Sequence, residues 1–127
     1  MTVTLDVLAD ELAVCRLPAD AAVAVPPAPA ALYSVTRTAD EVSVVCPATL
    51  APAASTVEAG WRALRVRGPL DFTLTGVLAA IADPLAAAGI PIFALSTYDT
   101  DYVLVAAADL PATVDTLRAA GHTVDAS

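Results

Sequence analysis

Few side chains in this sequence carry reactive chemistry. His122 is the sole histidine and has no acidic neighbour, so it is a poor candidate for a general base. We expect it on the surface or on an edge strand. Cys15 and Cys46 lie in valine-rich segments and are expected to be reduced, buried hydrophobic residues. Two cysteines and one histidine without close spacing do not make a zinc site, so we expect no metal and no cofactor.

A polar segment at residues 96–101 holds two carboxylates, Asp99 and Asp101, in the sequence Ser-Thr-Tyr-Asp-Thr-Asp. Aspartates are common in turns for conformational reasons, so this pair predicts a turn, with ligand contact as a second role and acid–base catalysis as a remote one. The sequence contains no nucleophile elbow, phosphate-binding loop or dinucleotide motif. An enzyme is therefore the least favoured class of function.

The segment at residues 68–76 is the most informative for binding. It joins an expected strand to an expected helix, and the free N–H groups at a helix start suit a carboxylate. Gly76 has no Cβ, which leaves room for a ligand or for another backbone. Tight packing of helix against strand is the alternative reason for this glycine, and the sequence leaves both open.

The second half of the chain predicts a regular order of elements around these two segments. Apolar residues recur at helical spacing between residues 73 and 88, where Gly89 is an expected stop. The expected elements are a strand at 61–67, a helix at 73–88, strands at 90–97 and 102–107, a helix at 109–120 and a strand at 122–124. This β-α-β-β-α-β order is that of the ferredoxin-like fold.

The first half predicts a reduced copy of the second. Its expected strands are at 5–8, 12–17, 31–37 and 42–46, and a proline-rich connection at 18–31 stands where the first helix would be. The two halves are similar when Tyr33 is aligned with Phe93 and Val44 with Leu104. Residues 47–59 are expected to be loop or short helix and to separate the halves.

We therefore predict an α+β fold with two ferredoxin-like βαββαβ units. The expected units are residues 1–56, which form the reduced one, and residues 57–127, which form the complete one. Two sheets placed side by side would cover the strand edges of each, which short strands in an apolar chain require.

Charge and hydropathy limit the partners. The chain has 14 acidic and 6 basic residues, all of them arginine, for a net charge of −8. Without a basic cluster we expect no binding to nucleic acid or to an anionic membrane surface. We find neither a secretory signal nor a long apolar segment, so the expected location is the cytoplasm.

The sequence resembles the ACT domain, a small-ligand sensor appended to many enzymes of amino-acid biosynthesis. Gly68, Phe72 and Gly76 carry this resemblance, together with Gly-Ile-Pro-Ile from residue 89 and Leu-Ser-Thr from residue 95. The strings Arg-Val-Arg-Gly-Pro-Leu-Asp-Phe-Thr-Leu-Thr-Gly and Ile-Phe-Ala-Leu-Ser-Thr-Tyr-Asp-Thr-Asp-Tyr-Val-Leu-Val are similar to stand-alone bacterial tandem ACT proteins and to the CASTOR-type arginine sensor family.

The resemblance implies that an amino acid binds at the interface of ACT units, against the helix-start loop and the turn at the end of the strand. The matching positions are Asp71, Leu74, Thr75, Gly76, Val77, Thr97, Tyr98 and Asp101. One position departs from the arginine sensors, because Leu74 stands where they carry an acidic residue. This departure leaves an apolar or aromatic amino acid open as the ligand.

The expected function is thus a non-catalytic sensor or regulatory protein that binds an amino acid. The alternative is a module for dimerisation or partner docking that has no ligand. The sequence leaves open which amino acid binds, whether the chain forms a homodimer, and which protein partner receives a signal.

Overall fold

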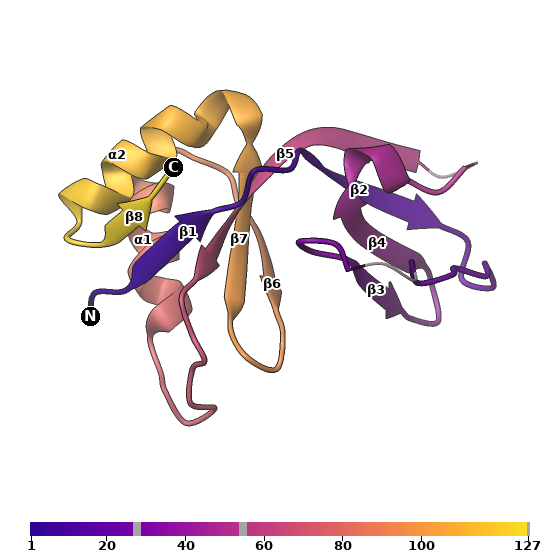
Figure 1. The fold of residues 1–127 in the computed structure, drawn as a ribbon, viewed down its shortest axis with the longest axis horizontal. Helices are drawn as coiled ribbons and strands as arrows, with labels where there is room; N and C mark the ends of the chain where they lie inside the picture. The colour runs from indigo at the N-terminus through magenta and orange to yellow at the C-terminus, as the bar shows by residue number, and fades with distance from the viewer. Residues whose placement is uncertain (27–28, 54–55, 127) are drawn as a thin grey trace. The chain divides into compact units, whose positions relative to one another are not determined.

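The computed structural model describes residues 1–26, 29–53 and 56–126, and it confirms the expected α+β class (Figure 1). The strands are β1 (Thr4–Val7), β2 (Leu12–Leu17), β3 (Ser34–Arg37), β4 (Val42–Pro47), β5 (Thr56–Val66), β6 (Phe93–Ser96), β7 (Asp101–Ala106) and β8 (Thr123–Asp125). The α-helices are α1 (Val77–Ala87) and α2 (Leu110–Ala119), and the short 3-10 helices are η1 (Ala48–Leu50) and η2 (Ala107–Asp109).

The chain forms two units, and the N-terminal strand belongs with the second half. One unit consists of Met1–Ala9 and Arg62–Ser127, and the other of Asp10–Trp61. The sequence predicted a division at residue 56, with residues 1–9 in the first half. They lie in the other unit because β1 pairs with β5 on one side and with β8 on the other.

The unit that contains both helices has the expected β-α-β-β-α-β order with β1 added to its sheet. The strand order is β8-β1-β5-β7-β6. β1 is antiparallel to β5 and parallel to β8. Leu5 of β1 is fully buried, as are Ile81 and Leu85 of α1 and Leu117 of α2, and these residues share one core with β5, β7 and β8. Both helices therefore cover the same face of this sheet (Figure 1).

The Asp10–Trp61 unit is an antiparallel sheet in the order β3-β4-β2-β5. Its described residues include no α-helix. The strand β5 begins at Thr56, within a segment predicted as loop or short helix, because β2 pairs with it as far as Arg16. The register shifts between Leu12 and Val14, beside Gly60 with a φ of 81°. A bulge at a glycine explains why the sequence of this stretch does not predict a regular strand.

The two cysteines are part of the core of the Asp10–Trp61 unit, as predicted. Cys15 and Cys46 are both free thiols and are buried among Ala13, Leu17, Val42 and Val44. Burial raises the pKa of the Cys46 thiol from 9.0 to about 11, with a smaller contribution from the neighbouring Cys15. A thiol that stays protonated at neutral pH is a poor nucleophile, which agrees with a structural role.

A hairpin is repeated in the two units, but its alignment is shifted by one position from the predicted one. The first residue of β3 corresponds to that of β6, and the same holds for β4 with β7 and for η1 with η2. Thr38 opens one turn and Thr97 the other, and their N–H groups donate to the carbonyls of Glu41 and Thr100, both at 2.9 Å. Tyr33 precedes β3 whereas Phe93 opens β6, so the predicted alignment of these two aromatic residues is wrong.

His122 is buried, not on the surface or on an edge strand as predicted. It is only 5% exposed and immediately precedes β8. Its Nδ1 accepts a hydrogen bond from the Val3 N–H at 3.1 Å, and its Nε2 lies 2.9 Å from the carbonyl oxygen of Ala80 in α1. The ring thus ties the N-terminus to the first helix.

No helix in the described part of the chain is long and apolar enough to cross a membrane.

We expect His122→Ala to lower the free energy of unfolding by about 2–4 kcal/mol, because it opens a cavity and leaves two partly buried backbone groups without the partner that the ring supplies. Urea denaturation followed by circular dichroism measures this change. Thr123→Ala is the matched control, since its side chain is exposed and should cost about 0.5 kcal/mol or less. Equal stability of the two variants would contradict a structural role for the ring.

Candidate functional site

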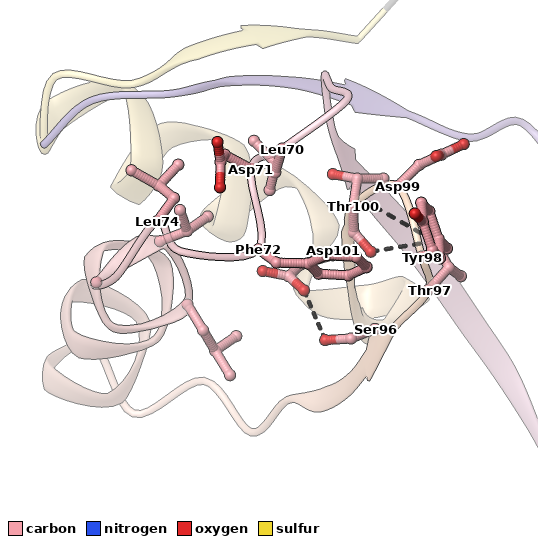
Figure 2. Close-up of a pocket in the computed structure, with 13 residues that line it drawn as sticks. Leu70, Asp71, Phe72, Leu74, Ser96, Thr97, Tyr98, Asp99, Thr100 and Asp101 are labelled. Atoms are coloured by element: carbon pink, nitrogen blue, oxygen red, sulfur yellow. Dashed lines mark hydrogen bonds between the residues drawn. The ribbon is translucent and has the colours of Figure 1, made fainter.

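A cavity of about 350 Å³ opens in the unit that contains both helices (Figure 2). Three segments line it: the 70–76 loop, the first residues of α1, and the 96–101 segment that joins β6 to β7. The lining residues are Leu70, Asp71, Phe72, Leu74, Gly76, Val77, Leu78, Ser96, Thr97, Tyr98, Asp99, Thr100 and Asp101. The volume lies at the lower end of the range for small-molecule sites.

Backbone contacts hold the two loops together at the base of the cavity. The Leu70 N–H donates to the Asp99 carbonyl at 2.7 Å. The Thr100 hydroxyl, which is buried, donates to the Val66 carbonyl at 2.6 Å. A Cβ on Gly68 would lie 3.1 Å from the Asp99 oxygen and 3.3 Å from the Thr100 Cβ, so a larger residue here would push the two loops slightly apart.

Asp71 shapes the loop and does not cap the helix. Its Oδ1 accepts hydrogen bonds from the Thr73 N–H and the Thr73 hydroxyl, both at 2.8 Å, and its carbonyl accepts one from the Leu74 N–H at 3.0 Å. These bonds to the carboxylate lower the pKa of Asp71 from its ordinary value of 3.8, the Thr73 N–H contributing most. The spacing of apolar residues predicted a helix start at Thr73. The turn explains why the helix begins later.

The helix α1 begins at Val77, and Gly76 is its N-cap with a φ of 84°. No side chain caps this end, and the first helical hydrogen bond runs from the Ala80 N–H to the Gly76 carbonyl at 2.9 Å. The N–H groups of the first turn are therefore free of intrahelical partners, and they carry the positive end of the helix dipole. A Cβ on Gly76 would meet nothing within 4 Å, so tight packing is not the reason for this glycine.

The charged side chains that line the cavity are all acidic. They are Asp71, Asp99 and Asp101. Asp101, which is half-buried, accepts a hydrogen bond from the Ser96 hydroxyl at 2.6 Å, and Figure 2 shows its carboxylate among the labelled lining residues.

The arginines of this unit have partners elsewhere. Arg67 forms a salt bridge with Asp6, and Arg65 lies 3.6 Å from the same carboxylate. Arg62 and Arg118 donate to the carbonyls of Leu8 and Val124. Among the described residues that line the cavity, none is basic.

The structure brings seven of the eight predicted site residues to the cavity. Thr75 is the exception, since it is exposed and does not line it. The lining residues that the sequence reasoning missed are Leu70, Phe72, Leu78, Ser96, Asp99 and Thr100. All of them lie within or next to the two segments that were singled out, so proximity in sequence was the available signal. His122, Cys15 and Cys46 lie outside the lining, as expected.

Comparison with protein families gives two adjacent matches. A model described as an ACT domain matches residues 56–119, which is half of the chain. A second model, described as an N-terminal domain, matches residues 10–53. The ACT match contains every residue that lines the cavity.

Curated relatives match a similar share of the chain. The cytosolic arginine sensor for mTORC1 subunit 1 of Homo sapiens is 39% identical over 59 residues, and the protein of the same name from Rattus norvegicus is 37% identical. The match covers 46% of this chain but only 18% of either relative. The matched segment therefore covers less than a fifth of the sensor's length.

Solved structures resemble the chain over its whole length. A protein of Agobacterium tumefaciens has a TM-score of 0.90 and 35% identity, with coverage of 100% of this chain and 95% of the other. The aspartate kinase of Clostridium acetobutylicum has a TM-score of 0.66 at 11% identity, with coverage of 94% and 35%. At that identity the kinase shows a shared fold alone.

We expect the amide proton of Thr73 to titrate with a midpoint below pH 3.8. The hydrogen bonds to the ionised Asp71 carboxylate are present above that pH and are lost as the pH falls through the lowered pKa. Two-dimensional NMR of the amide resonance against pH measures the midpoint. Asp71→Asn keeps an acceptor oxygen and removes the titration, so it is the control. A midpoint at or above 3.8 would show that the turn does not hold the carboxylate.

Proposed function

Because the chain belongs to the ACT domain family, we propose that it is a non-catalytic regulatory protein that binds a free amino acid in the cavity beside α1. The supporting observation is the pairing of an uncapped helix start with carboxylates across one cavity. A free amino acid carries a carboxylate and an ammonium on the same carbon atom. The cavity offers a complementary group for each.

We place the ligand's carboxylate at the start of α1. Gly76, Val77 and Leu78 line the cavity there, and the N–H groups of the first turn can donate to an anion. The helix dipole adds about 0.3–1 kcal/mol of stabilisation, and more where the site is partly buried. The free space over Gly76 lets the carboxylate approach the backbone.

We place the ligand's ammonium at the opposite wall, near Asp101. One oxygen of this carboxylate accepts from Ser96, which fixes the side chain, and a carboxylate has acceptor positions beyond that bond. A charge-assisted hydrogen bond contributes about 1.5–3 kcal/mol. The Asp71 carboxylate is engaged by its own turn, so Asp101 is the better partner for the ammonium.

The side chain of the ligand remains to be identified by experiment. Arginine is one candidate, through the curated relatives that are named as arginine sensors. Leu74 lines the cavity at a position where the resemblance predicts an acid, and with Leu70 and Leu78 it favours an apolar or aromatic amino acid. Three carboxylates without a balancing base disfavour aspartate and glutamate as ligands.

A module for dimerisation or partner docking is the second candidate. The exposed rings of Phe72 and Tyr98 favour it, because exposed apolar groups mark interaction sites of many kinds. A thermal-shift screen of the twenty amino acids separates the two functions. A ligand of the native state raises the melting temperature, whereas a docking module is unaffected by every amino acid.

We expect Asp101→Asn to weaken the binding of the amino acid that emerges from this screen by roughly tenfold or more, because the variant loses the charge that faces the ammonium. Titration calorimetry measures the change. Asp83→Asn is the matched control, since Asp83 is exposed on α1, does not line the cavity, and alters the net charge equally. Equal affinities of the two variants would place the ammonium elsewhere.

Gly76 and Gly89 allow a second test with its own control. Both lie at ends of α1 with positive φ, 84° and 74°, and a Cβ at either would meet nothing within 4 Å. Each Gly→Ala variant should cost about 1–2 kcal/mol in stability through the same backbone strain. Only Gly76→Ala places a methyl group in the cavity, so it alone should weaken binding in calorimetry. Loss of binding in both variants would indicate an effect through the fold.

A further inference from the structure

The exposed apolar side chains of this unit are concentrated at the cavity. Among the described residues of Met1–Ala9 and Arg62–Ser127, the large hydrophobic residues that are exposed are Met1, Phe72, Leu74, Leu78 and Tyr98. All but Met1 line the cavity. Side chains that pack in no core contribute little to folding, so their gathering at one site points to something that they contact when it is bound.

Phe72 and Tyr98 form a pair across the cavity's two loops. Phe72 is 72% exposed and Tyr98 is 80% exposed, and their ring centroids lie 4.7 Å apart with an angle of 78° between the planes. Phe72 follows the Asp71 turn, whereas Tyr98 lies in the turn between β6 and β7. Figure 2 shows the ring of Phe72 directed toward Tyr98.

The position of each ring follows from backbone contacts that do not involve the rings. The Asp71 turn orients the chain at Phe72, and the hydrogen bond between Leu70 and Asp99 holds the loop of one ring against the turn of the other. The two backbone segments that carry the rings therefore have a defined arrangement before any ligand arrives, which lowers the entropy cost of ordering these loops on binding.

We propose that Phe72 and Tyr98 are the specificity-determining residues of the amino-acid site, and that they select ligands with a large side chain over those with a small one. This proposal rests on the proposed function. With the carboxylate at the start of α1 and the ammonium at Asp101, we place the side chain of the ligand beside the two rings, which also line the cavity. A large side chain covers ring surface that is otherwise in water, and a methyl group does not reach it.

The test compares four probes that share the α-carboxylate and the ammonium: alanine, leucine, phenylalanine and arginine. Calorimetry, with competition where binding is weak, gives the ratio of each affinity to that of alanine. In the parent protein we expect at least one large amino acid to bind roughly tenfold or more tightly than alanine. Phe72→Ala and Tyr98→Ala should reduce this ratio by about tenfold while the affinity for alanine changes little.

Two further variants separate a role of the rings from a general loss of apolar surface. Tyr98→Phe keeps the ring and should keep the ratio. Leu50→Ala removes an exposed apolar side chain that does not line the cavity, and it should also leave the ratio unchanged. Melting temperatures close to that of the parent check that each variant is folded, as the exposure of the rings predicts.

The outcomes distinguish this proposal from the proposed function. If alanine binds the parent as tightly as the large amino acids, or if the ratio survives in both ring variants, the role of Phe72 and Tyr98 is overturned while the amino-acid site stands. If none of the four probes binds the parent, the amino-acid site itself is overturned and the role of the rings falls with it.

Discussion

The hydrogen bond from the Leu70 N–H to the Asp99 carbonyl determines where a cavity can form. It joins the 68–76 loop to the 97–100 turn at a distance of 2.7 Å. A side chain at residue 68 would meet the same carbonyl at 3.1 Å, so a residue larger than Gly68 would push the two loops slightly apart. Beyond the joint the loop must diverge from the turn to reach the start of α1, and the space between them is the cavity. This backbone contact thus holds together the two loops that supply most of the cavity lining.

The repeated hairpin shows how the two units differ in the part of the chain that the structure describes. Thr38 and Thr97 close equivalent turns with the same backbone hydrogen bond, so the strand-turn-strand element occurs twice. In the Asp10–Trp61 unit the described residues form no α-helix, and the hairpin has no helix start of its own unit beside it. A polar turn alone offers acceptors for an ammonium. The anion-binding half of the site comes only with a helix N-terminus.

Helices and strands could be predicted from the sequence where a local pattern of residues specifies them. The β-α-β-β-α-β order follows from apolar periodicity, and seven of the eight predicted residues meet at the cavity because they lie in two short segments. The start of α1 was missed because Asp71 bonds to Thr73, a local alternative that apolar spacing does not reveal. The pairing of β1 depends on β5 and β8, which lie in the second half of the sequence, and no local pattern specifies such distant partners.

The charges of the chain support the proposal that the site binds a zwitterion. The sequence has six basic residues, all arginine, and those in the unit with the cavity are engaged by carboxylates or carbonyls and are not among the residues that line it. An anionic ligand would therefore meet three aspartates with only the helix dipole in its favour, worth about 0.3–1 kcal/mol at an exposed site. In the proposed complex an amino acid adds an ammonium that faces Asp101. The attraction between this ammonium and the acidic wall then adds to the favourable interaction of the carboxylate with the start of α1.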